Sequence, residues 1–307
     1  MSDLSVQLGT LRLKNPILTA SGTFGYGTEY GEYYDINLLG GIVTKTITLL
    51  PREGNPTPRL AETPCGMLNS IGLANVGVDR FLREKLPELE MLDTTVIVNV
   101  AGNTVEEYGE VVEKIQEHRR VDAIELNVSC PNVKQGGLAF GTDAETTKKI
   151  VSRARQATKK PLFVKLTPNV THIVSVALAA VEGGADGLSL INTVLGMGVN
   201  IETKQPLLAR GIGGLSGPAI KPIALAKVWQ VARAVSVPII GIGGIMTWRD
   251  VVEFLIVGAT AVEVGTLSFV EPEGPVKILT GLEQYCLEKG ITKITDLVGT
   301  LKEGSVE

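Results

Sequence analysis

Short apolar runs rich in β-branched residues recur along the chain, and most are followed by a stretch with helical periodicity. A nearly continuous apolar run is typical of a parallel strand whose two faces are both covered. The runs predict eight strands, at 16–21, 41–47, 95–100, 123–128, 161–166, 187–192, 238–242 and 261–265. Amphipathic periodicity predicts helices at 104–117, 144–157, 172–182, 218–234, 248–257 and 275–289, with Asp143 and Thr171 as N-caps of two of them.

Eight successive β-then-α units predict an α/β fold, the closed (β/α)₈ TIM barrel, with an open doubly wound sheet as the alternative. Residues 6–8 and 11–13 flank Gly9-Thr10 and predict an N-terminal β-hairpin. Two long intervals, 48–94 and 193–237, contain Pro- and Gly-rich segments, and we interpret them as insertions on the catalytic face. The whole chain, 1–307, is therefore expected to form a single barrel domain.

Composition and charge exclude several classes of function. The net charge is 29 − 33 = −4, without a long basic cluster, which argues against a nucleic-acid partner. No run of 18 apolar residues predicts a membrane span, and residues 1–18 do not have the pattern of a secretory signal. Two histidines and three scattered cysteines do not predict a metal site, and an odd cysteine count favours a reducing, cytoplasmic location. Whether Cys65 and Cys286 are reactive stays open.

Polar residues gather at the carboxyl ends of the predicted strands, where the catalytic residues of such barrels lie. They include two lysines, three asparagines and a thiol: Lys45, Lys165, Asn99, Asn127, Asn192 and Cys130. Each residue alone has an ordinary structural explanation, such as a surface lysine, a turn asparagine or a buried cysteine. Together they predict a polar ligand at the barrel mouth, because buried polar groups need partners.

Glycines after the last two strands predict the phosphate end of that ligand. Gly241-Ile-Gly-Gly244 and Gly265-Thr266 allow backbone N–H groups to approach an anion, although glycines in such places also simply make tight turns. No G-x-G-x-x-G motif occurs, so a mononucleotide cofactor is favoured over NAD. Lys165 would then lie beside a flavin ring and stabilise its reduced, anionic form.

Cys130 follows its strand in a segment that contains Gly136-Gly137, a pattern typical of a hinged lid that carries a base. An unperturbed thiol, with a pKa of about 8.5, is only about 3% ionised at pH 7. Cys130 therefore needs neighbouring positive charge, or alkaline pH, to act as a base.

At these residues the sequence resembles the class 1 dihydroorotate dehydrogenases, over nearly the whole chain. The most specific segments are Asn69-Ser-Ile-Gly-Leu-Ala-Asn75 and Asn127-Val-Ser-Cys-Pro-Asn132. The remaining matching segments are 20–22, 45–46, 165–168, 191–193, 241–244 and 264–266.

The resemblance implies an FMN enzyme that oxidises dihydroorotate to orotate in pyrimidine synthesis, with Cys130 taking the C5 proton. The implied FMN contacts are Ser21, Lys45, Thr46, Asn99, Asn127, Lys165, Ile191, Gly217, Gly243, Gly244, Gly265 and Thr266. The implied substrate contacts are Lys45, Asn69, Ser70, Ile71, Gly72, Leu73, Asn127, Asn192 and Thr193.

The subclass depends on a few positions. Ile71 and Thr193 stand where many fumarate-using class 1A members carry methionine and serine, and residues 191–197 resemble the class 1B catalytic subunit. Class 1B implies a heterotetramer of two catalytic chains and two partner subunits that carry FAD and a 2Fe-2S cluster and reduce NAD. A class 1A enzyme, a dihydropyrimidine dehydrogenase-like flavin barrel and a non-redox phosphate-binding barrel are the alternatives. The oligomeric state and the partner interface cannot be read from the sequence.

Overall fold

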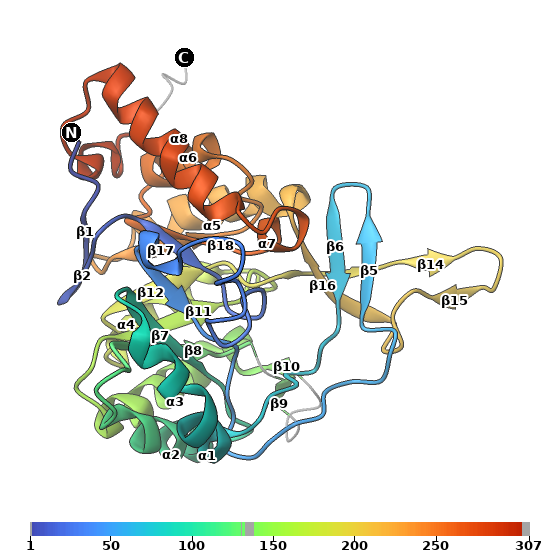
Figure 1. The fold of residues 1–307 in the computed structure, drawn as a ribbon. Helices are drawn as coiled ribbons and strands as arrows, with labels where there is room; N and C mark the ends of the chain where they lie inside the picture. Colours follow the sequence, from blue (N-terminus) through green and yellow to red (C-terminus); the bar gives the residue numbers. More distant parts are fainter. Residues whose placement is uncertain (1, 130, 133–137, 303–307) are drawn as a thin grey trace.

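The computed structural model describes residues 2–129, 131–132 and 138–302, and its centre is a closed barrel of eight parallel strands (Figure 1). Going round the barrel, the strands follow the order β11-β12-β17-β18-β3-β4-β7-β8. Their bounds are β3 Ile17–Thr19, β4 Gly41–Val43, β7 Thr95–Val100, β8 Ala123–Asn127, β11 Leu162–Leu166, β12 Gly187–Leu190, β17 Ile239–Ile242 and β18 Ala261–Val264. The predicted TIM barrel is confirmed, and each predicted strand appears, most of them shortened by one to four residues.

The eight strands are almost wholly buried, because helices cover the outside and side chains fill the inside. The helices are α1 Val78–Arg80, α2 Val105–Gln116, α3 Ala144–Ala157, α4 Ile173–Glu182, α5 Lys221–Ala232, α6 Trp248–Ile256, α7 Leu267–Val270 and α8 Gly274–Lys289. None of the helices in the described part of the chain is long and apolar enough to cross a membrane.

The predicted N-caps differ in outcome. Asp143 accepts a hydrogen bond from the backbone N–H of Thr146 and caps α3 as expected. Thr171 is not a cap. The N-cap of α4 is His172, whose side chain makes no capping hydrogen bond, and the first turn of α4 is held by packing of Ile173 and Val176 in the core.

The two long intervals form a second sheet above the barrel mouth. It has four antiparallel strands in the order β13-β16-β6-β5, with bounds β5 Leu60–Thr63, β6 Gly66–Asn69, β13 Val194–Met197 and β16 Ile212–Ser216. A hairpin, β14 Val199–Asn200 and β15 Gln205–Pro206, projects beyond it (Figure 1). The insertions therefore lie on the face where the strands end, as predicted, and their pairing across the two intervals was not predicted.

Shorter elements complete the chain. The predicted N-terminal hairpin is present as β1 Val6–Leu8 and β2 Leu11–Leu13, paired in register. A two-stranded sheet is formed by β9 Pro131–Asn132 and β10 Leu138–Ala139. Single turns of other helix types are η1 Ile36–Leu38, η2 Phe81–Lys85, η3 Pro87–Met91, η5 Phe140–Thr142, η6 Pro218–Ile220 and η7 Ile294–Leu297.

Candidate active site

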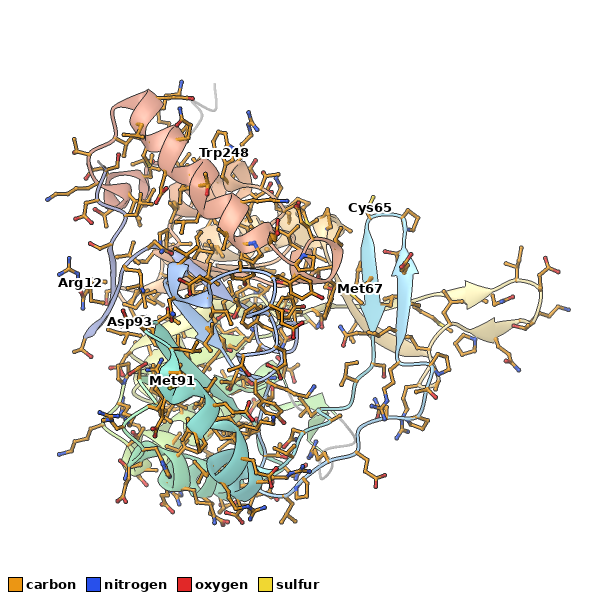
Figure 2. All side chains as sticks on the ribbon, viewed as in Figure 1. Arg12, Cys65, Met67, Met91, Asp93 and Trp248 are labelled. Atoms are coloured by element: carbon orange, nitrogen blue, oxygen red, sulfur yellow. The ribbon has the colours of Figure 1, made fainter. Side chains whose placement is uncertain are left out.

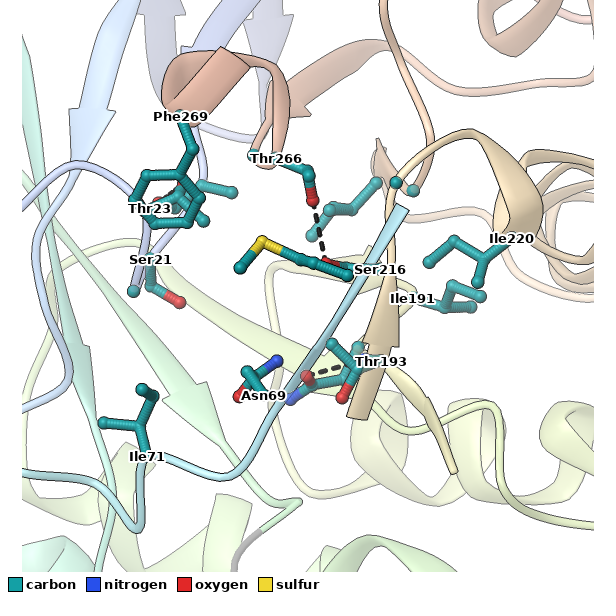
Figure 3. Close-up of a pocket in the computed structure, with 18 of the residues that line it drawn as sticks. Ser21, Thr23, Asn69, Ile71, Ile191, Thr193, Ser216, Ile220, Thr266 and Phe269 are labelled. Carbon is teal, nitrogen blue, oxygen red and sulfur yellow. Dashed lines mark hydrogen bonds between the residues drawn. The ribbon is translucent and has the colours of Figure 1, made fainter. Parts of the chain in front are cut away.

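A cavity at the carboxyl ends of the barrel strands collects most of the residues singled out in the sequence (Figure 3). It lies between the barrel and the insertion sheet, since its lining comes from strand ends and from β6 and β16. The predicted site residues that line it are Ser21, Lys45, Thr46, Asn69, Ile71, Leu73, Asn127, Lys165, Ile191, Asn192, Thr193, Gly217, Gly243, Gly244, Gly265 and Thr266.

Three predicted site residues in the described part of the chain do not line this cavity. Asn99 is fully buried inside the barrel, and its amide donates to Oε1 of Glu125 at 2.5 Å. Ser70 accepts a hydrogen bond from the Asn55 amide, and Gly72 lies in a left-handed turn against Asn55. Cys130, the expected base, lies outside the described residues.

Three asparagines surround one side of the cavity. Asn192 donates its amide to Oδ1 of Asn127 at 3.3 Å, and Oδ1 of Asn192 accepts the backbone N–H of Thr193 at 2.8 Å. Asn69 donates to the carbonyl of Gly214 on the neighbouring strand at 3.2 Å. These bonds fix the amides in place, and among the described residues nothing accepts a hydrogen bond from the side-chain nitrogen of Asn127. The group therefore offers both donors and acceptors to a planar polar ligand.

Backbone donors line the opposite side. The N–H groups of Gly243, Gly244, Gly265 and Thr266 donate to no other group in the described part of the chain. Both Gly243 and Gly244 have positive φ, and a Cβ on Gly244 would lie 2.9 Å from the carbonyl oxygen of Gly217. Glycine is thus required here for the backbone itself to reach a ligand. Four unused N–H groups at one place suit the oxygens of a phosphate.

Lys45 adds a positively charged side chain to the cavity lining. Its ammonium group makes no ion pair or hydrogen bond within the described residues, and the residue is half-buried beside the asparagines. Burial lowers the pKa of Lys45, partly offset by the charge of Glu29. An unpaired lysine of this kind gains from a ligand that brings a carboxylate.

Lys165 lies on the floor of the cavity and is only 4% exposed. Its Nζ is 2.8 Å from Oε2 of Glu263 and 3.6 Å from Oε1 of Glu125, and it also donates to the Ser21 hydroxyl at 3.3 Å. Because β11 is not paired with β18, the Lys165–Glu263 contact crosses the inside of the barrel. Burial alone lowers the pKa of Lys165, but the two carboxyl groups raise it above its usual value.

The sequence interpretation missed Glu125 and Glu263. Each is the one charged residue of a buried strand, Ala123–Asn127 and Ala261–Val264, which is a signal that the sequence carries but that was not used. Twelve lining residues were also not among the predicted site residues: Ala20, Gly22, Thr23, Leu60, Met67, Ala74, Ser216, Ile220, Ile242, Ile245, Met246 and Phe269. Ser216 accepts a hydrogen bond from the Thr266 hydroxyl at 2.8 Å and ties the insertion sheet to the end of β18 (Figure 3).

Comparison with known proteins agrees with this geometry. A model of the family described as "Dihydroorotate dehydrogenase" matches residues 3–286. The chain belongs to the dihydroorotate dehydrogenase family. The predicted family, and with it the predicted class of oxidoreductase, is confirmed.

Curated relatives within the family are similar over nearly their full length. The chain is 55% identical to a protein of Geotalea uraniireducens (strain Rf4), over 97% of this chain and 98% of that protein. It is 51% identical to a protein of Bacteroides thetaiotaomicron, over 98% of this chain and 100% of the relative. Both relatives are named the catalytic subunit of dihydroorotate dehydrogenase B (NAD(+)), the type that the residues at 191–197 favour.

Proposed function

We propose that this chain binds FMN and oxidises dihydroorotate to orotate as the catalytic subunit of an NAD-linked dihydroorotate dehydrogenase. The observation that carries the proposal is the arrangement of one cavity: four unused backbone N–H groups at one side, an amide cluster with an unpaired lysine at the other, and Lys165 on the floor between strands. The N–H groups suit a phosphate, the amides with the lysine suit a planar ring that bears a carboxylate, and Lys165 suits the anionic edge of a reduced flavin.

The residues present fit FMN by their donor chemistry. The N–H groups of Gly243, Gly244, Gly265 and Thr266 would hold its phosphate, and Lys165 would lie beside the ring edge that gains negative charge on reduction. When bound, FMN supplies the acceptor for the hydride that leaves C6 of the substrate.

The remaining residues would hold and deprotonate the substrate. Lys45 would pair with the dihydroorotate carboxylate, while Asn69, Asn127 and Asn192 would bind its amide edges and fix C5 and C6 in place. Cys130 would remove the proton from C5 as the thiolate. Removing the C5 proton while the C6–H bond breaks yields the C5=C6 double bond of orotate.

The names of the relatives support a partner subunit, since they call each protein a catalytic subunit of an NAD(+) enzyme. We propose that electrons leave this chain through a partner that carries FAD and a 2Fe-2S cluster, in a cytoplasmic heterotetramer of two chains of each kind. Nothing in the described cavity provides a second dinucleotide site, which fits this division of labour.

The test is to purify the chain with and without such a partner and to measure its flavin and its electron acceptor. The proposal expects one FMN per chain and NAD reduction by dihydroorotate only when the partner is present. Rapid turnover with fumarate by the chain alone, unchanged by the partner, would contradict the NAD-linked assignment. A folded chain that cannot be reconstituted with FMN would contradict the cofactor.

A further inference from the structure

Glu125 and Glu263 form a buried carboxyl pair beneath the candidate flavin site. Both are 1% exposed, and both carboxyl groups approach the same Lys165 ammonium, Glu263 at 2.8 Å and Glu125 at 3.6 Å. One oxygen of each is paired: Oε1 of Glu125 accepts from Asn99, and Oε2 of Glu263 accepts from Lys165. The other two oxygens, Oε2 of Glu125 and Oε1 of Glu263, accept no conventional hydrogen bond from the described residues.

Only one protonation state of the two glutamates balances the charge of Lys165. If both carboxyls were ionised, two like charges would face each other in a dry interior with a single cation, which is strongly disfavoured. If both were protonated, the Lys165 ammonium would be buried without a counter-ion, which is also costly. One proton held by the pair removes both problems, because it leaves one negative charge for one positive charge and supplies a donor where the buried oxygens have none.

We propose that Glu125 and Glu263 share one proton, and that this singly charged pair positions the Lys165 ammonium at the cavity floor with no net charge in the cluster. The two glutamates are positioning residues, since neither lines the cavity. They act on a bound flavin through Lys165. That last point rests on the proposed function, whereas the shared proton does not.

The neighbouring elements contribute only neutral groups. Asn99 of β7 hydrogen-bonds Glu125, Ser21 after β3 accepts from Lys165, and the buried hydroxyl of Ser189 on β12 has no partner among the described residues. Among the described residues of the barrel strands, the buried charged side chains are Glu125, Lys165 and Glu263.

The pKa values of the two glutamates shift in the directions that a shared proton requires. Burial and the adjacent Glu125 charge raise the pKa of Glu263 well above its usual value. Burial also acts to raise the pKa of Glu125, but the Lys165 charge and the hydrogen bonds from its neighbours outweigh burial and lower it. The proton therefore resides mainly on Glu263.

Infrared spectroscopy of the purified chain tests the shared proton directly. In heavy water at neutral pD every exposed carboxyl is ionised, so a protonated-carboxyl carbonyl band reports a buried acid. The band is expected in the wild type, absent from E263Q and from E125Q, and retained in E113Q, a variant of an exposed glutamate on α2. In each single variant the remaining carboxylate pairs with Lys165, so no proton is held. A wild type without the band overturns the proposal even if the variants do not fold, as does a band that persists in both glutamine variants.

The midpoint potential of bound FMN tests the charge count. E125Q and E263Q each keep a neutral cluster and should leave the potential near the wild-type value, whereas the double variant leaves a net positive charge and should raise it. If each single variant raises the potential, both glutamates are ionised in the wild type and the proposal is wrong. A chain that binds no FMN would contradict the proposed function but leave the infrared result to decide the shared proton.

Discussion

Asn192, just after β12, donates its side-chain amide to the side-chain oxygen of Asn127 at the end of β8, at 3.3 Å. The bond joins two strand ends that are separated by β11, so it fixes the relative positions of two amides that line the cavity. The backbone carbonyl of Asn127 is held in turn by the Tyr108 hydroxyl at 2.7 Å. These bonds therefore hold the proposed substrate contacts in place before a ligand binds.

Asn192→Ala should weaken orotate binding by about tenfold or more, because a ligand group loses one partner and Asn127 loses its orienting bond. Calorimetric titration with orotate measures the change. Asn200→Ala is the matched control, since Asn200 lies in the exposed β14–β15 hairpin and only orders its own turn. An Asn192→Ala protein that binds orotate as tightly as the wild type would remove Asn192 from the substrate site.

Gly244→Ala should abolish or strongly weaken FMN binding. The residue has φ of 71°, and the added Cβ would lie 2.8 Å from Cβ of Lys221 and 2.9 Å from the Gly217 oxygen, so the loop must move away from the ligand. Gly211→Ala has a similar positive φ, but its Cβ would meet nothing within 4 Å. Both variants should lose about 1–2 kcal/mol of unfolding free energy from backbone strain. Only Gly244→Ala should release flavin, as measured by flavin fluorescence, and equal FMN affinity in both variants would contradict this.

Asp250 links stability to pH outside the cavity. Its carboxylate caps the start of α6 by accepting from the backbone N–H groups of Met246 and Thr247, and it pairs with Lys221 at 2.6 Å. Burial acts to raise the pKa of Asp250, but the Lys221 and backbone hydrogen bonds outweigh it and lower the pKa.

Because the native pKa of Asp250 is lowered, its stabilisation is present above the unfolded value of about 3.9 and is lost as pH falls through the native value. Asp250→Asn should cost about 1–2 kcal/mol of unfolding free energy at pH 7, as for loss of a helix cap. The difference from wild type should shrink below about pH 4. Denaturant unfolding across this range measures it, with Glu253→Gln as a control, since Glu253 is the half-exposed second partner of Lys221. A pH-independent difference would contradict the ionised cap.

The barrel was predictable because the local pattern of apolar and polar residues indicates each of its strands and helices. Runs such as Thr95–Val100 are mostly apolar and β-branched, and α3 carries Ile150, Val151 and Ala154 on one buried face. The insertion sheet was not predictable in this way. Its pairing joins β6 to β16 across about 145 residues of chain, and the exposed, alternating strands of that sheet carry weak patterns.

The lining of the cavity was predictable where an unusual residue type stands at or near a strand end, as for Lys165, Asn192 and Gly244. The lining was less predictable where it depends on the direction in which a side chain points. Asn99 lies near the carboxyl end of β7, but its amide donates to Glu125 inside the barrel and does not line the cavity. No local sequence pattern shows whether a side chain at such a position points into the barrel or into the cavity. The role of Glu263 depends on a contact across the barrel, which becomes visible only once the barrel has closed.

We propose above that this cavity carries the oxidation of dihydroorotate with Cys130 as the base. The direct measurement is anaerobic stopped-flow reduction of the FMN-loaded chain by dihydroorotate, compared between wild type, Cys130→Ala and Cys65→Ala. Cys65 is the matched control, because it is exposed in the turn between β5 and β6 (Figure 2). The account predicts rapid bleaching in the wild type and in Cys65→Ala, none with dihydrouracil, and a loss of at least about a hundredfold in Cys130→Ala with FMN still bound. Bleaching of Cys130→Ala at the wild-type rate, or a wild-type flavin that dihydroorotate does not reduce, would contradict it.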